Sequence, residues 1–158
     1  MPLTTSDLYH EAKRQRMRSG KVPQVFRAMR KDDDGFPTLQ QSASALGVRP
    51  GVDLEFNPQG NVLVNGKGMS VNPAWRVISI LRIPRRLRNI MPGARGPNNT
   101  FCFRTGTGSF QQGDFAAGLT LEPDSAMHGN IAPAQVVPLD QYETDLAATR
   151  LDWQVDET

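Results

Sequence analysis

Apolar and β-branched residues are gathered into many short runs along the chain. Residues 25–29 and 100–105 are rich in β-branched and aromatic side chains and predict two strands. Residues 52–56 alternate apolar and charged side chains, which predicts a half-buried strand. Residues 119–122 and 128–134 predict further short extended segments. The pattern as a whole therefore predicts a strand-rich chain.

Helical periodicity is confined to a few short stretches. Residues 38–46 predict a short helix that Gly47 closes, because glycine is favoured just beyond a helix end. Residues 139–149 place apolar side chains at helical spacing and predict a C-terminal helix. Residues 6–18 predict a weaker helix with few apolar positions. Many short strands with few helices predict an α+β fold.

The most informative turn follows the apolar residues 62–64. Asn65 and Gly66 form a strong turn signal because both residue types tolerate a positive φ. Gly68 allows close approach of the backbone, and Ser70 then stands where a new extended segment begins. Two interpretations are open at this point. The segment is either a hairpin turn with a solvated serine, or the edge of a ligand pocket.

The 158 residues predict one domain, with a basic N-terminal extension at 1–20 and a single domain at 21–158. The chain has no apolar run near the roughly 18 residues of a membrane helix, and its beginning lacks the apolar core of a signal peptide. The single cysteine, Cys102, excludes an internal disulfide and predicts a buried strand thiol, because phenylalanines flank it.

The small net charge of +2 conceals a strong asymmetry. Residues 1–110 hold 17 of the 18 Lys and Arg residues but only 7 of the 16 Asp and Glu residues. Residues 111–158 hold one basic residue and 9 acidic residues. The two blocks can attract each other within the fold, or the basic block can meet a phosphate-bearing ligand or an acidic partner.

Several familiar site chemistries are missing from the sequence. It contains no Walker-type phosphate loop, no Gly-x-Gly-x-x-Gly fingerprint and no Gly-x-Ser-x-Gly nucleophile elbow. Two histidines and one cysteine do not suffice for the usual protein zinc sites, so we expect no metal. The candidate chemistry therefore rests on a few scattered polar residues.

Four of these residues have both a functional and a structural interpretation. Arg27 is the only charge inside an apolar strand pattern, and it can pair two phosphate oxygens or form an ordinary ion pair. His128 can act as an acid, a base or a ribose hydrogen-bond donor, or it can be structural. Glu122 can polarise a hydroxyl or be a solvated carboxylate. Ser70 has the two interpretations given above.

Three ordered segments resemble one protein family. They are Val-Phe-Arg-Ala-Met at 25–29, Gly-Lys-Gly-Met-Ser-Val at 66–71 together with Gly-Asn-Val at 60–62, and His-Gly-Asn-Ile-Ala-Pro-Ala at 128–134. They are similar to the first-strand, Ser-Val and His-x-x-Ile-x-Pro-Ala motifs of the type VI secretion exported toxin two family. The match covers roughly residues 22–150.

This resemblance implies a small split-sheet fold like that of ADP-ribosyltransferase toxins, with NAD as the cofactor. It implies a bacterial toxin that arrests growth, is delivered by a type VI system without a signal peptide, and is neutralised by a cognate immunity protein. Arg27 would bind the phosphates, with Gly68 and Ser70 beside the nicotinamide ribose and His128 at the scissile bond. Met69 stands where the family often has threonine. The usual transferase glutamate has no clear counterpart, and Glu122 and Gln135 are only neighbours of the third motif. Transfer to a target, NAD hydrolysis and a toxic activity of another kind all stay open, and in each case the resemblance implies a cytoplasmic site of action.

Two other functional classes compete with the toxin hypothesis. The arginines at 76–95, together with Trp75, Phe101 and Phe103, are compatible with RNA binding or a ribonuclease. No RNA-binding motif accompanies them, so nucleic acid is the less favoured partner. A non-enzymatic interaction protein, whose divided charge serves a partner, is the other alternative.

Overall fold

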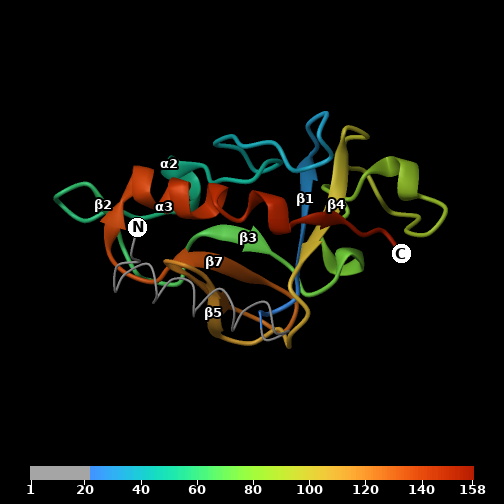
Figure 1. The fold of residues 1–158 in the computed structure, drawn as a ribbon. Coiled ribbons are helices and arrows are strands. Elements are labelled where there is room, and N and C mark those ends of the chain that lie inside the picture. Colours follow the sequence, from blue (N-terminus) through green and yellow to red (C-terminus); the bar gives the residue numbers. More distant parts are fainter. Residues whose placement is uncertain (1–21) are drawn as a thin grey trace, which may run out of the picture.

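The computed structural model describes residues 22–158, so the helix predicted at 6–18 lies outside the described residues. Strands that pair in several sheets dominate this part of the chain, and its helices are few and short (Figure 1). Every pairing between the named strands is antiparallel. The α+β class predicted from the sequence is therefore confirmed.

The first sheet has the strand order β1-β4-β9. Strand β1 (Val25–Arg30) pairs along its whole length with β4 (Thr100–Thr105), and both strands were predicted from their apolar runs. Strand β9 (Gln154–Val155) adds a short edge on the other side of β4. The end of the chain is thereby brought into the same sheet as β1, with β4 between them.

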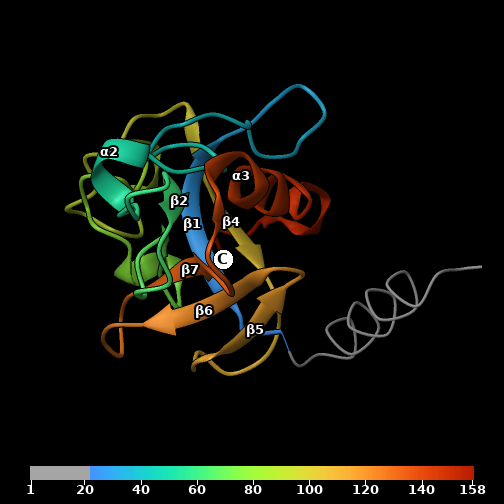
Figure 2. The ribbon, with the colours of Figure 1, turned by 90° about the vertical axis from the view of Figure 1, so that its left-hand side faces the viewer.

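The second sheet has the order β3-β7-β6-β5. Strand β3 (Met69–Val71) lies at one edge beside β7 (Gly129–Pro133), which pairs in turn with β6 (Leu119–Pro123). Strand β5 (Gly113–Ala116) forms the other edge. The strands of this sheet run across the direction of β1, as Figure 2 shows.

The remaining elements are short. Strands β2 (Asn61–Val62) and β8 (Val137–Pro138) form a separate two-stranded ladder, and β8 leads directly into helix α3 (Leu139–Ala147). Helix α3 confirms the predicted C-terminal helix. Helix α2 (Pro50–Asp53) has four residues. The described residues also form three 3₁₀ turns, at Trp75–Val77, Arg85–Leu87 and Arg150–Asp152.

The two larger sheets meet where β1 passes the end of β3. Phe26 donates its backbone N–H to the carbonyl of Asn72 at 2.7 Å, and Asn72 returns a bond to Phe26 at 3.0 Å. One core cluster fills the space between the sheets and α3, and it includes Met29, Met69, Phe103, Tyr142 and Trp153. This junction fixes the position of β1 side chains relative to β3.

The helix predicted at 38–46 is wrong. The Thr38 N–H donates to the Arg30 carbonyl, and the Leu46 N–H donates to the Thr38 carbonyl. Leu39 and Leu46 form an isolated bridge. Two serines in this stretch bond locally, since the Ser42 hydroxyl accepts the Ser44 N–H at 3.1 Å. Short hydroxyl side chains compete in this way with helical bonding. The stretch is a compact loop that packs beside β1.

The strand predicted at 52–56 is also wrong over most of its length. Pro50 stands at the start of helix α2, where proline is favoured. The Asp53 carboxylate accepts the Arg49 N–H at 2.7 Å and the Arg49 guanidinium at 3.0 Å, which closes one helical turn. Within 52–56 only Phe56 takes part in a β-bridge, an isolated one with Val62. The local capping interaction therefore overrides the alternating pattern.

The part of the chain from residue 22 onward has no helix that is both long enough and apolar enough to cross a membrane.

Candidate functional site

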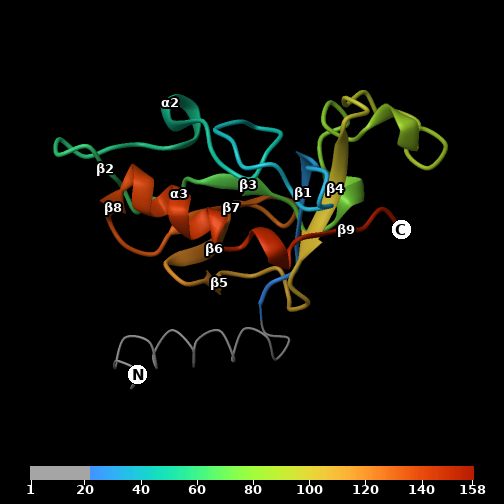
Figure 3. The same cartoon turned by 45° about the horizontal axis from the view of Figure 1, so that its top comes forward.

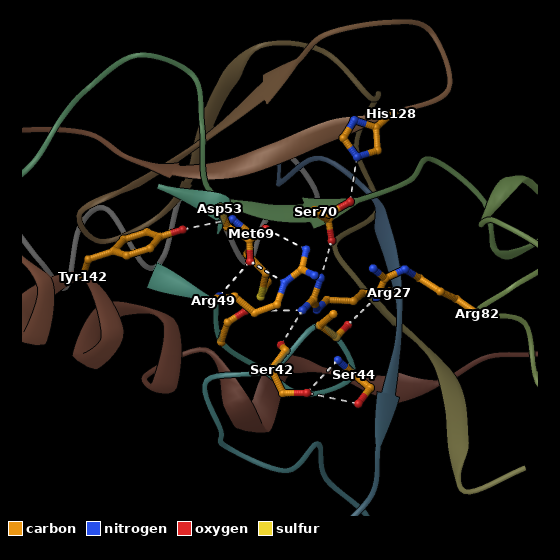
Figure 4. Close-up of polar contacts among 12 residues, drawn as sticks. Arg27, Ser42, Ser44, Arg49, Asp53, Met69, Ser70, Arg82, His128 and Tyr142 are labelled. Atoms are coloured by element: carbon orange, nitrogen blue, oxygen red, sulfur yellow. Dashed lines mark hydrogen bonds and ion pairs between the residues drawn. The ribbon is translucent and has the colours of Figure 1, made fainter. Parts of the chain in front are cut away.

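Ser70 and His128 meet across two neighbouring strands. Ser70 is the middle residue of β3 and stands opposite Asn130 of β7, while His128 immediately precedes β7. The Ser70 Oγ and His128 Nε2 atoms lie 2.6 Å apart (Figure 4). The antiparallel register therefore brings together two residues that are 58 positions apart in the sequence.

Asp124 extends this pair on the far side of the imidazole. His128 Nδ1 lies 2.8 Å and 2.9 Å from the two carboxylate oxygens of Asp124. An ionised carboxylate only accepts hydrogen bonds, so Nδ1 carries the donated proton and neutral Nε2 accepts the Ser70 hydroxyl. The result is a Ser70–His128–Asp124 chain that can withdraw a proton from the serine oxygen or orient its lone pairs toward a ligand.

The hairpin between β6 and β7 places Asp124 and His128 together. Asp124 and Ser125 donate their backbone N–H groups to the His128 carbonyl at 3.1 Å and 3.2 Å. Asn72, at the end of β3, donates its side-chain amide to the Met127 carbonyl at 2.8 Å and so ties the hairpin tip to the serine strand. The side chains of His128 and Asp124 are 37% and 57% exposed, so this end of the site is open to solvent.

Arg27 lies on the other side of Ser70 and is almost completely buried, with 6% of its surface exposed. Its Nη1 donates to the backbone carbonyl of Ser70 at 2.8 Å. Its remaining bonds hold the loop at residues 42–47, through the carbonyls of Ser42, Ala45 and Gly47 at 3.2, 3.1 and 3.3 Å. A single guanidinium therefore joins β1, β3 and this loop.

The Arg27 charge has no carboxylate partner among the ion pairs of residues 22–158. Burial, and secondarily the charge of Arg82, lowers the pKa of Arg27 to about 10. The group stays protonated at neutral pH, and backbone carbonyl dipoles rather than an anion surround it. A buried, uncompensated cation of this kind favours the approach of an anion.

The structure therefore brings Arg27, Ser70 and His128 together through hydrogen bonds to Ser70. It also separates the two interpretations of the turn at 65–66. Strand β2 pairs with β8, and β3 pairs with β7, so the segments on either side of the turn belong to different sheets. Ser70 is half-buried and hydrogen-bonded to His128, so the hairpin with a solvated serine is not what this stretch forms.

Gly68 is buried against the neighbouring strand. A Cβ atom at this position would lie 2.1 Å from the Ile131 carbonyl oxygen and 2.8 Å from the Tyr142 hydroxyl. That hydroxyl donates to the Ile131 carbonyl at 2.6 Å and accepts the Met69 N–H at 3.1 Å. The absence of a side chain at Gly68 is thus required by packing within the sheet.

Glu122 lies on β6, opposite Asn130, and does not contact the Ser70–His128 pair. Its carboxylate accepts hydrogen bonds from the side chains of Gln112 at 3.3 Å and Thr120 at 3.1 Å. Asp124, two residues further along the chain, is the acid that reaches His128 instead. Sequence reasoning missed it, although the spacing of four residues across a turn that follows Pro123 was an available signal.

The other sequence candidates take structural positions. Cys102 is fully buried, and burial raises the pKa of its thiol to about 12, so the expected inert strand thiol is confirmed. Within residues 22–158, His, Cys, Asp and Glu side chains form no group able to hold a metal ion.

The aromatic residues considered for RNA stacking are not free. Trp75 and Phe103 are 2% and 0% exposed. The half-buried Phe101 ring is contacted by the cationic groups of Lys31 and Arg86, at 4.1 Å and 4.5 Å from the ring centroid. Since base stacking needs an accessible ring face, these three side chains do not form a nucleic-acid platform.

Comparison of the chain with protein-family models, curated proteins and solved structures gave no match. The function proposed below is therefore based on the geometry of the site and on the motif resemblance.

Proposed function

We propose that this chain is a bacterial toxin of ADP-ribosyltransferase-like fold that acts on or through NAD and is neutralised by a cognate immunity protein. The observation that supports the proposal is the convergence of Arg27, Ser70 and His128. These residues come from the three resembling motifs, and two direct hydrogen bonds connect them through Ser70, at 2.8 Å and 2.6 Å. Short motifs that matched by chance would have no reason to meet in this way.

The groups present suit the chemistry of NAD. The ligand would supply a pyrophosphate, ribose hydroxyls and the bond between nicotinamide and ribose. The buried charge of Arg27 favours the anionic part of such a ligand. The Ser70 hydroxyl and His128 imidazole are suited to bind ribose hydroxyls, and Asp124 keeps the imidazole in one orientation. The two sheets that contain β1 and β3 would form the split-sheet frame of such a fold.

The position of Glu122 bears on whether the site would hydrolyse NAD or transfer ADP-ribose to a protein. Glu122, an acidic neighbour of the third motif, accepts hydrogen bonds from Gln112 and Thr120 and makes no described bond to Ser70. The residues around Ser70 therefore support NAD hydrolysis more directly than transfer to a protein. The toxin would act inside the target cell, where NAD is abundant, after delivery by a type VI system.

Release of nicotinamide from NAD by the purified chain tests the proposal, together with growth arrest on expression in bacteria. Ser70→Ala and His128→Ala are expected to reduce nicotinamide release by on the order of 10²-fold or more and to relieve the arrest. Ser109→Ala, which changes an exposed serine outside the site, is the matched control and should retain full activity. Unchanged toxicity of folded Ser70→Ala and His128→Ala variants would show that the assignment is wrong.

A further inference from the structure

Two arginines from distant parts of the chain hold the same loop at residues 42–47. Arg27 binds three of its carbonyls from beneath, as described above. Arg82 donates its Nη1 to the Ala43 carbonyl of the same loop at 2.9 Å. Figure 4 shows the two side chains approaching the loop region beside Ser70. Both positively charged groups therefore lie beside this loop.

This charge is not neutralised within residues 22–158. Neither Arg27 nor Arg82 forms an ion pair with a described carboxylate. Asp53, the acid whose charge acts on Arg27, is engaged with Arg49 through both carboxylate oxygens. Two nearby cations without a counterion repel each other, and an anion bound beside them would relieve that repulsion.

The two guanidinium groups differ in what they can still donate. Arg27 is buried and spends its Nε, Nη1 and Nη2 groups on four carbonyl oxygens. Arg82 is exposed and uses one N–H, on Ala43, of the five that a guanidinium carries. Only Arg82 therefore keeps a free fork that can bind two phosphate oxygens together.

The loop also carries two serine hydroxyl groups, which lie apart from this fork. The Ser42 and Ser44 Oγ atoms lie 3.2 Å apart, and in Figure 4 they point away from Arg82. We propose that Arg82 binds phosphate groups of the ligand, while Arg27 supports the loop and supplies charge from behind it.

This inference rests on the proposed function for the identity of the ligand, because the phosphates would be those of NAD. Arg27 also bonds the Ser70 carbonyl, so the phosphate site and the Ser70–His128 pair lie on opposite sides of one guanidinium. A pyrophosphate at Arg82 would then leave the ribose end of the ligand toward Ser70. Arg27, the residue that the motif resemblance names for the phosphates, becomes a positioning residue.

Calorimetric binding of inorganic pyrophosphate, ADP-ribose and nicotinamide to the full chain tests the inference. Arg82→Gln should weaken pyrophosphate and ADP-ribose binding by about 10-fold to 100-fold, the cost expected for lost charged hydrogen bonds. Nicotinamide carries no phosphate, so its affinity should not change. Arg95→Gln removes a nearby exposed arginine with no described side-chain bond and is the matched control.

Arg82→Lys keeps the test decisive if Arg82→Gln does not fold. Lysine retains the charge but not the fork, so a folded Arg82→Lys chain should also lose affinity, whereas the Ser42→Ala, Ser44→Ala double variant should keep it. Equal weakening by Arg95→Gln, or no pyrophosphate binding by the unaltered chain, overturns the inference. If NAD is cleaved with an unchanged KM in Arg82→Gln, the phosphate site is wrong and the proposed function stands. If pyrophosphate binds through Arg82 but NAD is not cleaved, the phosphate site stands and the proposed function is wrong.

Discussion

At the scale of single residues, Arg27 decides how the site is built. The sequence offered a choice between a phosphate ligand and an ordinary ion pair for this side chain. The structure shows a third arrangement, in which the guanidinium donates only to backbone carbonyls. An arginine placed in this way fixes the geometry of Ser70 and of the loop at 42–47 before any ligand arrives.

Arg27→Met is therefore expected to lower stability as well as activity. The change leaves four carbonyl oxygens without their donor, and unsatisfied buried polar groups are costly. We expect the free energy of unfolding to fall by about 3 kcal/mol or more, measured by urea denaturation. Arg95→Met, at an exposed position, should change it by less than about 0.5 kcal/mol. A stable Arg27→Met chain that lost only ligand binding would contradict the positioning role.

Asp124 is expected to act through His128. Asp124→Asn would place an amide beside Nδ1, which favours the tautomer that donates from Nε2 toward Ser70. The turnover of NAD should fall on the order of 10²-fold with a smaller change in KM, and Asp124→Glu should recover part of it. Asp114→Asn removes an exposed carboxylate elsewhere and should leave the kinetics unchanged. An unaltered turnover in Asp124→Asn would exclude the carboxylate from the site chemistry.

The shifted pKa of the Cys102 thiol predicts how the stability of the fold changes at alkaline pH. The folded pKa of about 12 lies above the ordinary value of 9.0 because the thiol is buried. Between these values the unfolded chain loses the proton and the folded chain keeps it, so stability falls as pH rises from about 9 to 12. In urea denaturation across this range, Cys102→Ala should show a shallower decline than the unaltered chain. Parallel declines would mean that the thiol is not buried in solution.

At the scale of elements, the pairing of β3 with β7 carries the site. Strand β3 has only three residues, so its position depends on contacts outside its own ladder. Tyr142, from helix α3, supplies one such contact by bonding both Met69 of β3 and Ile131 of β7. Burial raises the pKa of this tyrosine, so its hydroxyl remains a hydrogen-bond donor over the physiological range.

Gly68→Ala is expected to disrupt this arrangement. The added methyl group would lie within 2.1 Å of the Ile131 carbonyl oxygen, which is backbone and cannot rotate away. We expect a loss of about 3 kcal/mol in the free energy of unfolding, with a matching loss of activity. Gly113→Ala is the control, since a Cβ there meets nothing within 4 Å. Equal stability of the two variants in thermal denaturation would show that β3 can shift to accommodate the change.

Elements with a strong local signal were predictable from the sequence, and those set by distant contacts were not. Strand β4 and helix α3 follow their apolar patterns closely. The loop at 42–47 does not, because its carbonyls bond to Arg27 and Arg82, which are distant in the sequence. Asp124 was missed for a similar reason, since its role depends on a hairpin that brings it back beside His128.

At the scale of the whole molecule, the divided charge is only partly paired internally. The segment at 154–158 lies against the basic half of the chain, where Asp156 pairs with Arg104 and Glu157 pairs with Arg86. Trp75 also donates its indole N–H to the Thr158 carbonyl at 3.0 Å. The predicted attraction between the two blocks is therefore confirmed for these pairs. It leaves other arginines of residues 76–95 without a described carboxylate.

Those arginines share a surface with exposed aliphatic side chains. Ile80 and Leu81 are 42% and 64% exposed, and Arg85 and Arg95 nearby are exposed without an ion pair among the described residues. Figure 3 shows this green-yellow part of the chain beside β4, on the side away from α3. Exposed aliphatic groups ringed by cations suit a protein partner that presents carboxylates around an apolar centre. The immunity protein of the proposed function would be such a partner.

The last prediction concerns this surface and the rate at which the acidic immunity protein binds it. Opposite charges accelerate encounter, so the association rate constant should fall as added salt shortens the Debye length from about 30 to 10 Å. Arg85→Glu together with Arg95→Glu should slow association more than it speeds dissociation, whereas Leu81→Ser should mainly speed dissociation, because it removes apolar contact. Arg86 is not used for charge reversal, because it already forms an ion pair with Glu157. Surface plasmon resonance at several salt concentrations measures both rates. An association rate that does not respond to salt would exclude electrostatic steering by this surface, and it would leave the assignment of Ser70 and His128 untouched.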